Sequence, residues 1–119
     1  MDLEACYRSF GGQLREVLDR LPSQRLVTRL LRKFPEDPSM AQLEAAFSSG
    51  DRETAFRCAH NMKGLCLNLG FPELLSSSSA LTEALRPGNE YREASAAALL
   101  EQVCRDHRRI CDAIAQLED

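Results

Sequence analysis

Long apolar runs are missing from this 119-residue sequence. No segment approaches the roughly 18–20 consecutive apolar residues that a membrane-spanning helix needs. The first four residues, MDLE, also lack the basic and then apolar pattern of a secretory signal. We therefore expect no membrane partner and a location in the cytoplasm.

An excess of positive charge is missing as well. The chain has 15 Lys and Arg residues against 18 Asp and Glu residues, which gives a formal net charge of -3 at pH 7. A chain with this balance has no overall field of the sign that attracts phosphate backbones. Nucleic acid is therefore not an expected partner.

The common nucleotide, metalloprotease and redox motifs are absent. There is no G-x-x-x-x-G-K-[ST] loop, no G-x-G-x-x-G turn, no H-E-x-x-H and no C-x-x-C pair. Five cysteines leave at least one thiol unpaired, and all but Cys6 lie in apolar helical patterns, so we expect reduced thiols. Any phosphate chemistry would need a nucleotide held by another protein.

Strong helix formers dominate the sequence, β-branched residues are few, and Gly or Pro recurs between the apolar patterns. This composition predicts an all-α fold without strands. With 44% hydrophobic residues, the chain fits one domain with one compact core. The expected helices occupy residues 3–10, 13–34 with a break or kink at 21–22, 38–49, 52–69, 72–86 and 91–117.

Two patterns in the later helices predict which side chains are buried. The serine run 76–79 keeps apolar neighbours on both sides and is predicted to lie on the surface of its helix. The last helix has residues spaced by three and four that predict a core seam: Ala97, Leu100, Cys104, His107, Cys111 and Ile114.

Three residues of that seam also admit a different interpretation. Cys104, His107 and Cys111 share one helix face and could supply soft ligands to zinc, although a fourth ligand would have to come from elsewhere. Packing in the core is the favoured interpretation, so we predict no metal site.

The helix at 52–69 carries the strongest functional signal. At about 100° per residue, one stripe of it is apolar and predicted to be buried: Ala55, Cys58, Ala59, Met62, Cys66 and Leu69. His60 lies about 140° from Ala55 on this helix and is predicted to face solvent. An exposed histidine often has no role, so its neighbours decide the interpretation.

Four neighbours favour a functional His60. Gly64, one turn on, costs a helix about 1 kcal/mol relative to alanine but leaves room beside the imidazole for a bulky group or another protein. Lys63 can bring an ammonium close to a phosphoryl oxygen, unless it is an ordinary solvated lysine. Phe56 and Leu67 form an apolar rim typical of a docking surface, unless neighbouring helices cover them.

The segment 59–70, AHNMKGLCLNLG, resembles the signature of histidine-containing phosphotransfer (HPt) domains: H-x-x-K-G, a small residue, then Leu-Gly. The resemblance implies one domain over residues 1–119, with short N-terminal helices at about 3–34 and an antiparallel four-helix bundle at about 38–117. It also implies that His60 is the phosphoacceptor, that Lys63 stabilises the phosphoryl group and that Gly64 gives the partner access.

The expected function is a phosphotransfer module of a two-component phosphorelay. The resemblance implies a receiver domain as partner, which would bring the aspartate and its Mg²⁺, and a sensor histidine kinase as a further partner. The chain itself would bind no cofactor, have no kinase activity and be a monomer. The alternative is a helical adaptor that is never phosphorylated and binds its partner through Phe56 and Leu67; the intact His60, Lys63 and Gly64 argue against it.

Overall fold

Helices make up all the regular structure of the computed structural model, which describes residues 1–118. No strand occurs in this range, so the all-α prediction is confirmed. None of the helices described is long and apolar enough to cross a membrane. The elements are α1 (Leu3–Ser9), α2 (Leu14–Leu18), α3 (Gln24–Lys33), the short 3-10 helix η1 (Phe34–Glu36), α4 (Ser39–Ser48), α5 (Arg52–Leu69), α6 (Pro72–Leu85) and α7 (Glu93–Ala115).

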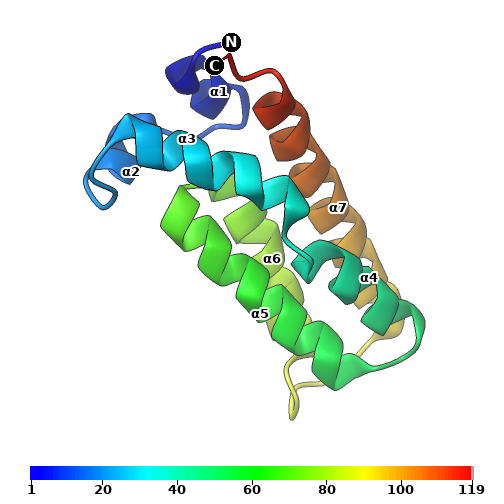
Figure 1. Cartoon of the computed structure of the whole chain (residues 1–119). Helices are drawn as coiled ribbons and strands as arrows, with labels where there is room; N and C mark the ends of the chain where they lie inside the picture. The colour runs from blue at the N-terminus through cyan, green and yellow to red at the C-terminus, as the bar shows by residue number, and fades with distance from the viewer. Residues whose placement is uncertain (119) are drawn as a thin grey trace.

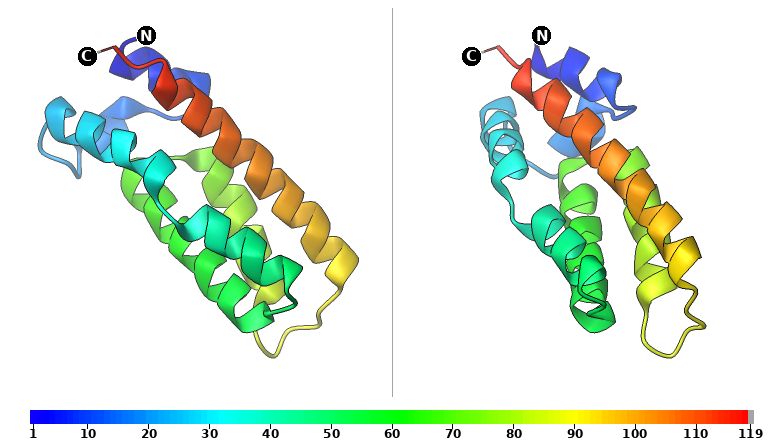
Figure 2. Two further views of the ribbon diagram at one scale, coloured as in Figure 1. Left: turned by 45° about the vertical axis from the view of Figure 1, so that its right-hand side comes forward. Right: turned by 90° about the vertical axis from the view of Figure 1, so that its right-hand side faces the viewer.

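The last four helices form an elongated bundle in which each helix packs on the next. α4 contacts α5, α5 contacts α6, and α6 contacts α7. Figure 1 shows these neighbours running in opposite directions, as the short connections between them require. Helices α1, α2 and α3 gather at one end of the bundle, where the C-terminal ends of α5 and α7 also lie (Figures 1 and 2).

Capping residues set the limits of α5. The side chain of Asp51 accepts a hydrogen bond from the backbone N–H of Thr54 at 3.1 Å, which satisfies one of the free donors at the helix start. Gly70 ends the helix in the left-handed conformation, with φ 79°. Pro72 then opens α6 at its first turn, where a missing N–H costs nothing.

The break or kink predicted at residues 21–22 is a complete interruption. α2 ends at Leu18, and α3 starts after Ser23, whose hydroxyl accepts from the N–H of Leu26 at 3.1 Å. The N-terminal segment therefore contains three separate short helices. Its first residue lies beside the end of α7, where the Met1 ammonium pairs with Glu118 at 2.9 Å.

The prediction that the serine run lies on the helix surface is wrong for two of its members. Ser77 and Ser78 are buried. The Ser78 hydroxyl donates to the carbonyl of Leu74 at 2.6 Å, so the polar group is satisfied within its own helix and can be buried without penalty. Burial raises the pKa of the Cys66 thiol on the facing helix α5, and the Ser78 side chain partly opposes this shift.

The predicted seam of the last helix is also misplaced. The structure buries a neighbouring line of α7: Ala96, Val103, Ile110, Ala113 and Ile114. Of the predicted seam only Ile114 is among them, and the other five are half-buried. The buried line repeats every seven residues (96, 103, 110), as the predicted seam does, but it is rotated around the helix, so the pattern marked one edge of the apolar face.

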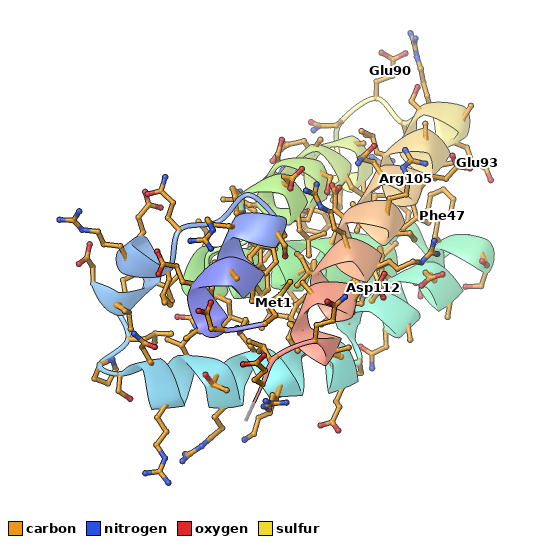
Figure 3. All side chains as sticks on the ribbon, turned by 90° about the horizontal axis from the view of Figure 1, so that it is seen from above. Met1, Phe47, Glu90, Glu93, Arg105 and Asp112 are labelled. Carbon is orange, nitrogen blue, oxygen red and sulfur yellow. The ribbon has the colours of Figure 1, made fainter. Side chains whose placement is uncertain are left out.

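One edge of that face is only partly covered. α7 packs closely along α6, and the packing of α7 against α4 is weaker. A depression remains there, lined by Phe47 of α4 and by Ala97, Leu100 and Cys104 of α7. Figure 3 shows Phe47 and Arg105 on this same side of the molecule.

Candidate functional site

The middle of α5 presents His60 to solvent, as the helical spacing predicts. All six residues of the predicted apolar stripe are buried, and His60 is exposed. Because the buried stripe fixes how α5 is rotated in the bundle, the imidazole is held on the outside of the protein. It is accessible to a partner without any change of fold.

The imidazole has one aromatic neighbour. The ring of Phe56, one turn earlier, stacks beside it with centroids 6.3 Å apart and planes inclined by 23°. Phe56 is half-buried, and the guanidinium of Arg86 from α6 lies over its ring, 5.1 Å from the centroid. Leu67, two turns beyond His60, is 55% exposed. Leu67 of the expected rim is therefore exposed, whereas Arg86 partly covers Phe56.

Gly64 adjoins an open surface. A Cβ added at this position would have no atom of another residue within 4 Å, so the packing of the protein does not require glycine here. His60 and Gly64 line a depression of about 490 Å³ with Asn61, Leu65, Asn68, Asp37 and Ser39. The missing side chain opens this depression beside the imidazole, at a cost in helix propensity of about 1 kcal/mol.

The charges around His60 come from two helices. Lys63 is half-buried on α5, and no ion pair to it exists within residues 1–118. On α6, Arg86 pairs with Glu83 at 2.8 Å. This hydrogen-bonded arginine holds the pKa of the Glu83 carboxyl below its usual value, and the positive charge of Lys63 acts in the same direction. The charge of Arg86 is therefore offset by Glu83, whereas Lys63 lies one turn from His60 with no ion-pair partner among residues 1–118.

The comparison with protein families decides what this arrangement is. A family model described as the Hpt domain matches residues 25–119. The chain belongs to the Hpt domain family. Hpt domains take part in histidine phosphotransfer in two-component signalling, where they interact with receiver domains and kinases. No curated protein and no solved structure matches the chain.

The Hpt match begins after α1 and α2, yet two residues before it, Tyr7 of α1 and Arg20 just beyond α2, hold the end of the helix that carries His60. The hydroxyl of Tyr7 donates to the carbonyl of Leu69 at 2.6 Å. Arg20 donates to the carbonyls of Leu67 at 2.9 Å and Asn68 at 3.3 Å. These carbonyls belong to the last turn of α5, where the helix itself provides no N–H group to pair with them. The segment before the Hpt match thus caps α5.

Sequence patterns did not reveal Arg20, Glu83 or Arg86. Each lies more than one helix turn outside the segment 59–70, and each reaches the Hpt site only because separate helices pack together. The sequence offers one local signal for these three residues, a charge near a helix end. Such charges are too common to single out residues that reach another helix.

The three residues considered as zinc ligands, Cys104, His107 and Cys111, pack at the edge of the core. The ring of His107 lies 5.2 Å from that of Phe34, and the Cys111 thiol lies 3.7 Å from Nδ1 of His107. Burial lowers the pKa of His107 and raises that of Cys111. Within residues 1–118 of this Hpt protein, no three His, Cys, Asp or Glu side chains are grouped as a metal would require.

Proposed function

We propose that His60 is the phosphoacceptor of this Hpt domain and exchanges a phosphoryl group with an aspartate of a receiver domain. The observation that carries the proposal is the exposed imidazole in the middle of α5, next to a glycine whose side-chain position opens onto free surface. The only other histidine, His107, is half-buried against Phe34 and less accessible.

The transfer is an in-line displacement at phosphorus. A lone pair of an unprotonated imidazole nitrogen of His60 attacks the phosphorus of the aspartyl phosphate, and an N–P bond forms. The P–O bond to the aspartate breaks, the carboxylate oxygen keeps the electron pair, and the other ring nitrogen of His60 keeps its proton. The reverse displacement returns the phosphoryl group. The attacking nitrogen carries its own lone pair, so no separate base is needed.

Positioning and charge neutralisation are the main demands of phosphoryl transfer. Lys63 provides a positive charge one turn from the imidazole, where it would face the phosphoryl oxygens. Gly64 would let the receiver approach, and Phe56 and Leu67 would give it an apolar surface to dock on. The family resemblance implies that the receiver brings the aspartate and its Mg²⁺, and that this chain contributes no metal.

Incubation with a panel of receiver domains phosphorylated with labelled phosphate would test the proposal. At least one receiver should lose its label as the Hpt chain gains it. The label on the Hpt chain should be labile in acid and stable in base, as an N–P bond is. Label with the opposite stability would place the phosphoryl group on another residue type.

A second outcome would favour the adaptor interpretation. If a receiver binds the chain with an affinity that depends on Phe56 and Leu67, but no active receiver in the panel transfers label, the domain would be a binding module without phosphotransfer. Phe56→Ala and Leu67→Ala variants, compared by calorimetry with the wild type, would provide that measurement.

A further inference from the structure

Helix α3 concentrates positive charge in an otherwise acidic chain. Residues 20–33 contain five Lys or Arg residues and no Asp or Glu, although the whole chain has a net charge of -3. Three of these, Arg25, Arg29 and Lys33, follow one another at four-residue intervals and are all exposed. They lie opposite the side of α3 that is buried through Val27 and Leu31. We call Arg25, Arg29 and Lys33 the α3 basic face.

Acidic neighbours do not neutralise this face. Four arginines elsewhere in the protein pair with carboxylates: Arg8 with Glu4, Arg86 with Glu83, Arg92 with Glu90 and Arg109 with Glu73. Within residues 1–118 no such pair involves the α3 basic face.

The pattern does not help α3 to fold. Like charges four residues apart on a helix repel one another, so the pairs 25–29 and 29–33 both oppose helix formation. Attachment of α3 to the bundle is provided by the buried Val27 and Leu31. Lys33 in the last turn of α3 is favoured by the helix dipole, but Arg25 in the first turn is disfavoured by it, so stability alone does not account for the charge.

Helix α3 lies next to the surface around His60. Figures 1 and 2 show α3 crossing the C-terminal end of α5, and the two helices are in contact. Just beyond α3 and η1, Asp37 and Ser39 line the same depression as His60 and Gly64. Just before α3, Arg20 is bonded to the carbonyl of Leu67. A protein that covers His60 thus lies next to α3.

We propose that the α3 basic face binds an acidic surface of the receiver domain, beside the aspartate that exchanges the phosphoryl group with His60. This inference rests on the proposed function. A receiver must bring to His60 a carboxylate and the oxygen ligands that hold its Mg²⁺, and such ligands are mainly carboxylates. A partner with that chemistry is acidic where it meets His60, and the α3 basic face matches its charge.

Electrostatic attraction of this kind acts mainly on the rate of association. It guides the partner into the orientation in which aspartate and imidazole meet, and it weakens as salt screens the charges. It should not alter the displacement at phosphorus once the complex has formed. The binding step and the chemical step can therefore be separated by experiment.

The test compares two double variants that each remove two positive charges. Arg25→Gln/Arg29→Gln alters the α3 basic face, and Arg105→Gln/Arg108→Gln alters exposed arginines of α7, which packs on α6 and not next to His60. The probe is whichever receiver in the panel exchanges label with the wild type. Transfer is measured against receiver concentration at about 20 mM and at about 1 M salt, where the screening length falls to about 3 Å.

At low salt the α3 variant should need about tenfold more receiver for half-maximal transfer, with the maximal rate unchanged, and the difference should vanish at high salt. The α7 variant should behave as the wild type does. Equal effects of the two variants, or no effect of the α3 variant, would overturn the inference. The proposed function would still stand in that case, because the wild type transfers label. Circular dichroism of both variants verifies folding.

Two further probes address other anionic partners. Vesicles containing about 30% phosphatidylglycerol and a double-stranded DNA of 20 base pairs are titrated with the wild type and with the α3 variant at physiological salt. Neither should bind appreciably. Binding of either probe that is lost in the α3 variant, together with unchanged receiver transfer, would assign the basic face to a membrane or to nucleic acid and overturn the inference. Failure of the wild type to exchange label with any receiver would instead remove the proposed function.

Discussion

The imidazole of His60 and the ring of Phe56 lie nearly parallel, with centroids 6.3 Å apart. Through Phe56 the histidine is connected to α6, because the Arg86 guanidinium lies over the same ring and is itself held by Glu83. The surface beside the imidazole is therefore apolar on one flank and charged beyond it. A partner that docks there meets a rim built by two helices, and this rim leads to predictions for individual residues.

Gly64→Leu should separate stability from transfer. The new side chain would extend into open surface, and leucine favours the helix over glycine by close to 1 kcal/mol, so the variant should be at least as stable as the wild type. The same side chain would stand beside His60 and block a docking receiver, so transfer should fall by about tenfold or more. Urea unfolding and the labelled transfer assay measure the two effects.

Ala98→Leu is the matched control for that variant. Ala98 is an exposed position of α7, so the substitution adds bulk to a helix surface that does not adjoin His60. Its transfer rate should equal that of the wild type. If Gly64→Leu also transfers at the wild-type rate, access through Gly64 is not required.

Tyr7→Phe should destabilise the protein. The Tyr7 hydroxyl is buried and donates to the Leu69 carbonyl at 2.6 Å, so its loss leaves an acceptor in the last turn of α5 without its partner. The expected cost is about 1–2 kcal/mol of unfolding free energy. Tyr91→Phe removes a hydroxyl from an exposed tyrosine and should change the stability by less than about 0.5 kcal/mol. Equal unfolding midpoints for the two variants would contradict the capping role of Tyr7.

His107 should make the stability depend on pH. Burial lowers its pKa, with Glu44 and Asp37 partly opposing the shift, so the folded protein binds the proton less readily than the unfolded chain. The unfolded state then takes up more protons as the pH falls below about 6.5, and the free energy of unfolding should decrease there. His107→Gln removes this contribution. Urea unfolding at pH 7.5 and 5.5 should give a smaller loss in the variant; a loss as large as that of the wild type would contradict the prediction.

The rotation of α5 could be predicted from sequence because all the necessary information lies within one helix. A spacing of 100° per residue places Ala55 and Met62 together and His60 apart from them, whatever the neighbouring helices do. The same local rule failed for Ser78, since a hydroxyl that bonds to its own helix can be buried as an apolar group is. It also failed for Cys104, which lies half-buried at the edge of the buried face of α7.

The contacts that join separate helices were beyond the sequence patterns. Arg86 reaches Phe56, and Arg20 reaches Leu67, only because of the angles at which α2, α5 and α6 meet. Those angles follow from the packing of many side chains at once. The candidate phosphoacceptor could thus be selected from one segment, but the residues that surround it could not.

Lys63→Ala should slow transfer without abolishing it. The substitution removes a positive charge one turn from His60, which would stabilise the phosphoryl oxygens, but it leaves the nucleophile in place. A tenfold lower rate, equivalent to about 1.4 kcal/mol, is the expected effect at saturating receiver. Lys63→Arg keeps the charge and should recover most of the rate. A Lys63→Ala variant as fast as the wild type would show that the ammonium has no part in transfer.

His60→Gln should abolish phosphoryl acceptance and leave the fold unchanged. Glutamine keeps size and polarity but has no nucleophilic imidazole nitrogen, so no N–P bond can form. The side chain is exposed, so the unfolding free energy should stay within about 0.5 kcal/mol of the wild type. His107→Gln provides the control, because it removes the other histidine, should lower the stability and should still accept the label. Label that persists in His60→Gln but disappears in His107→Gln would transfer the phosphoacceptor role to α7. If neither variant accepts label, the circular dichroism of each variant would reveal whether loss of structure, and not loss of the nucleophile, had stopped the reaction.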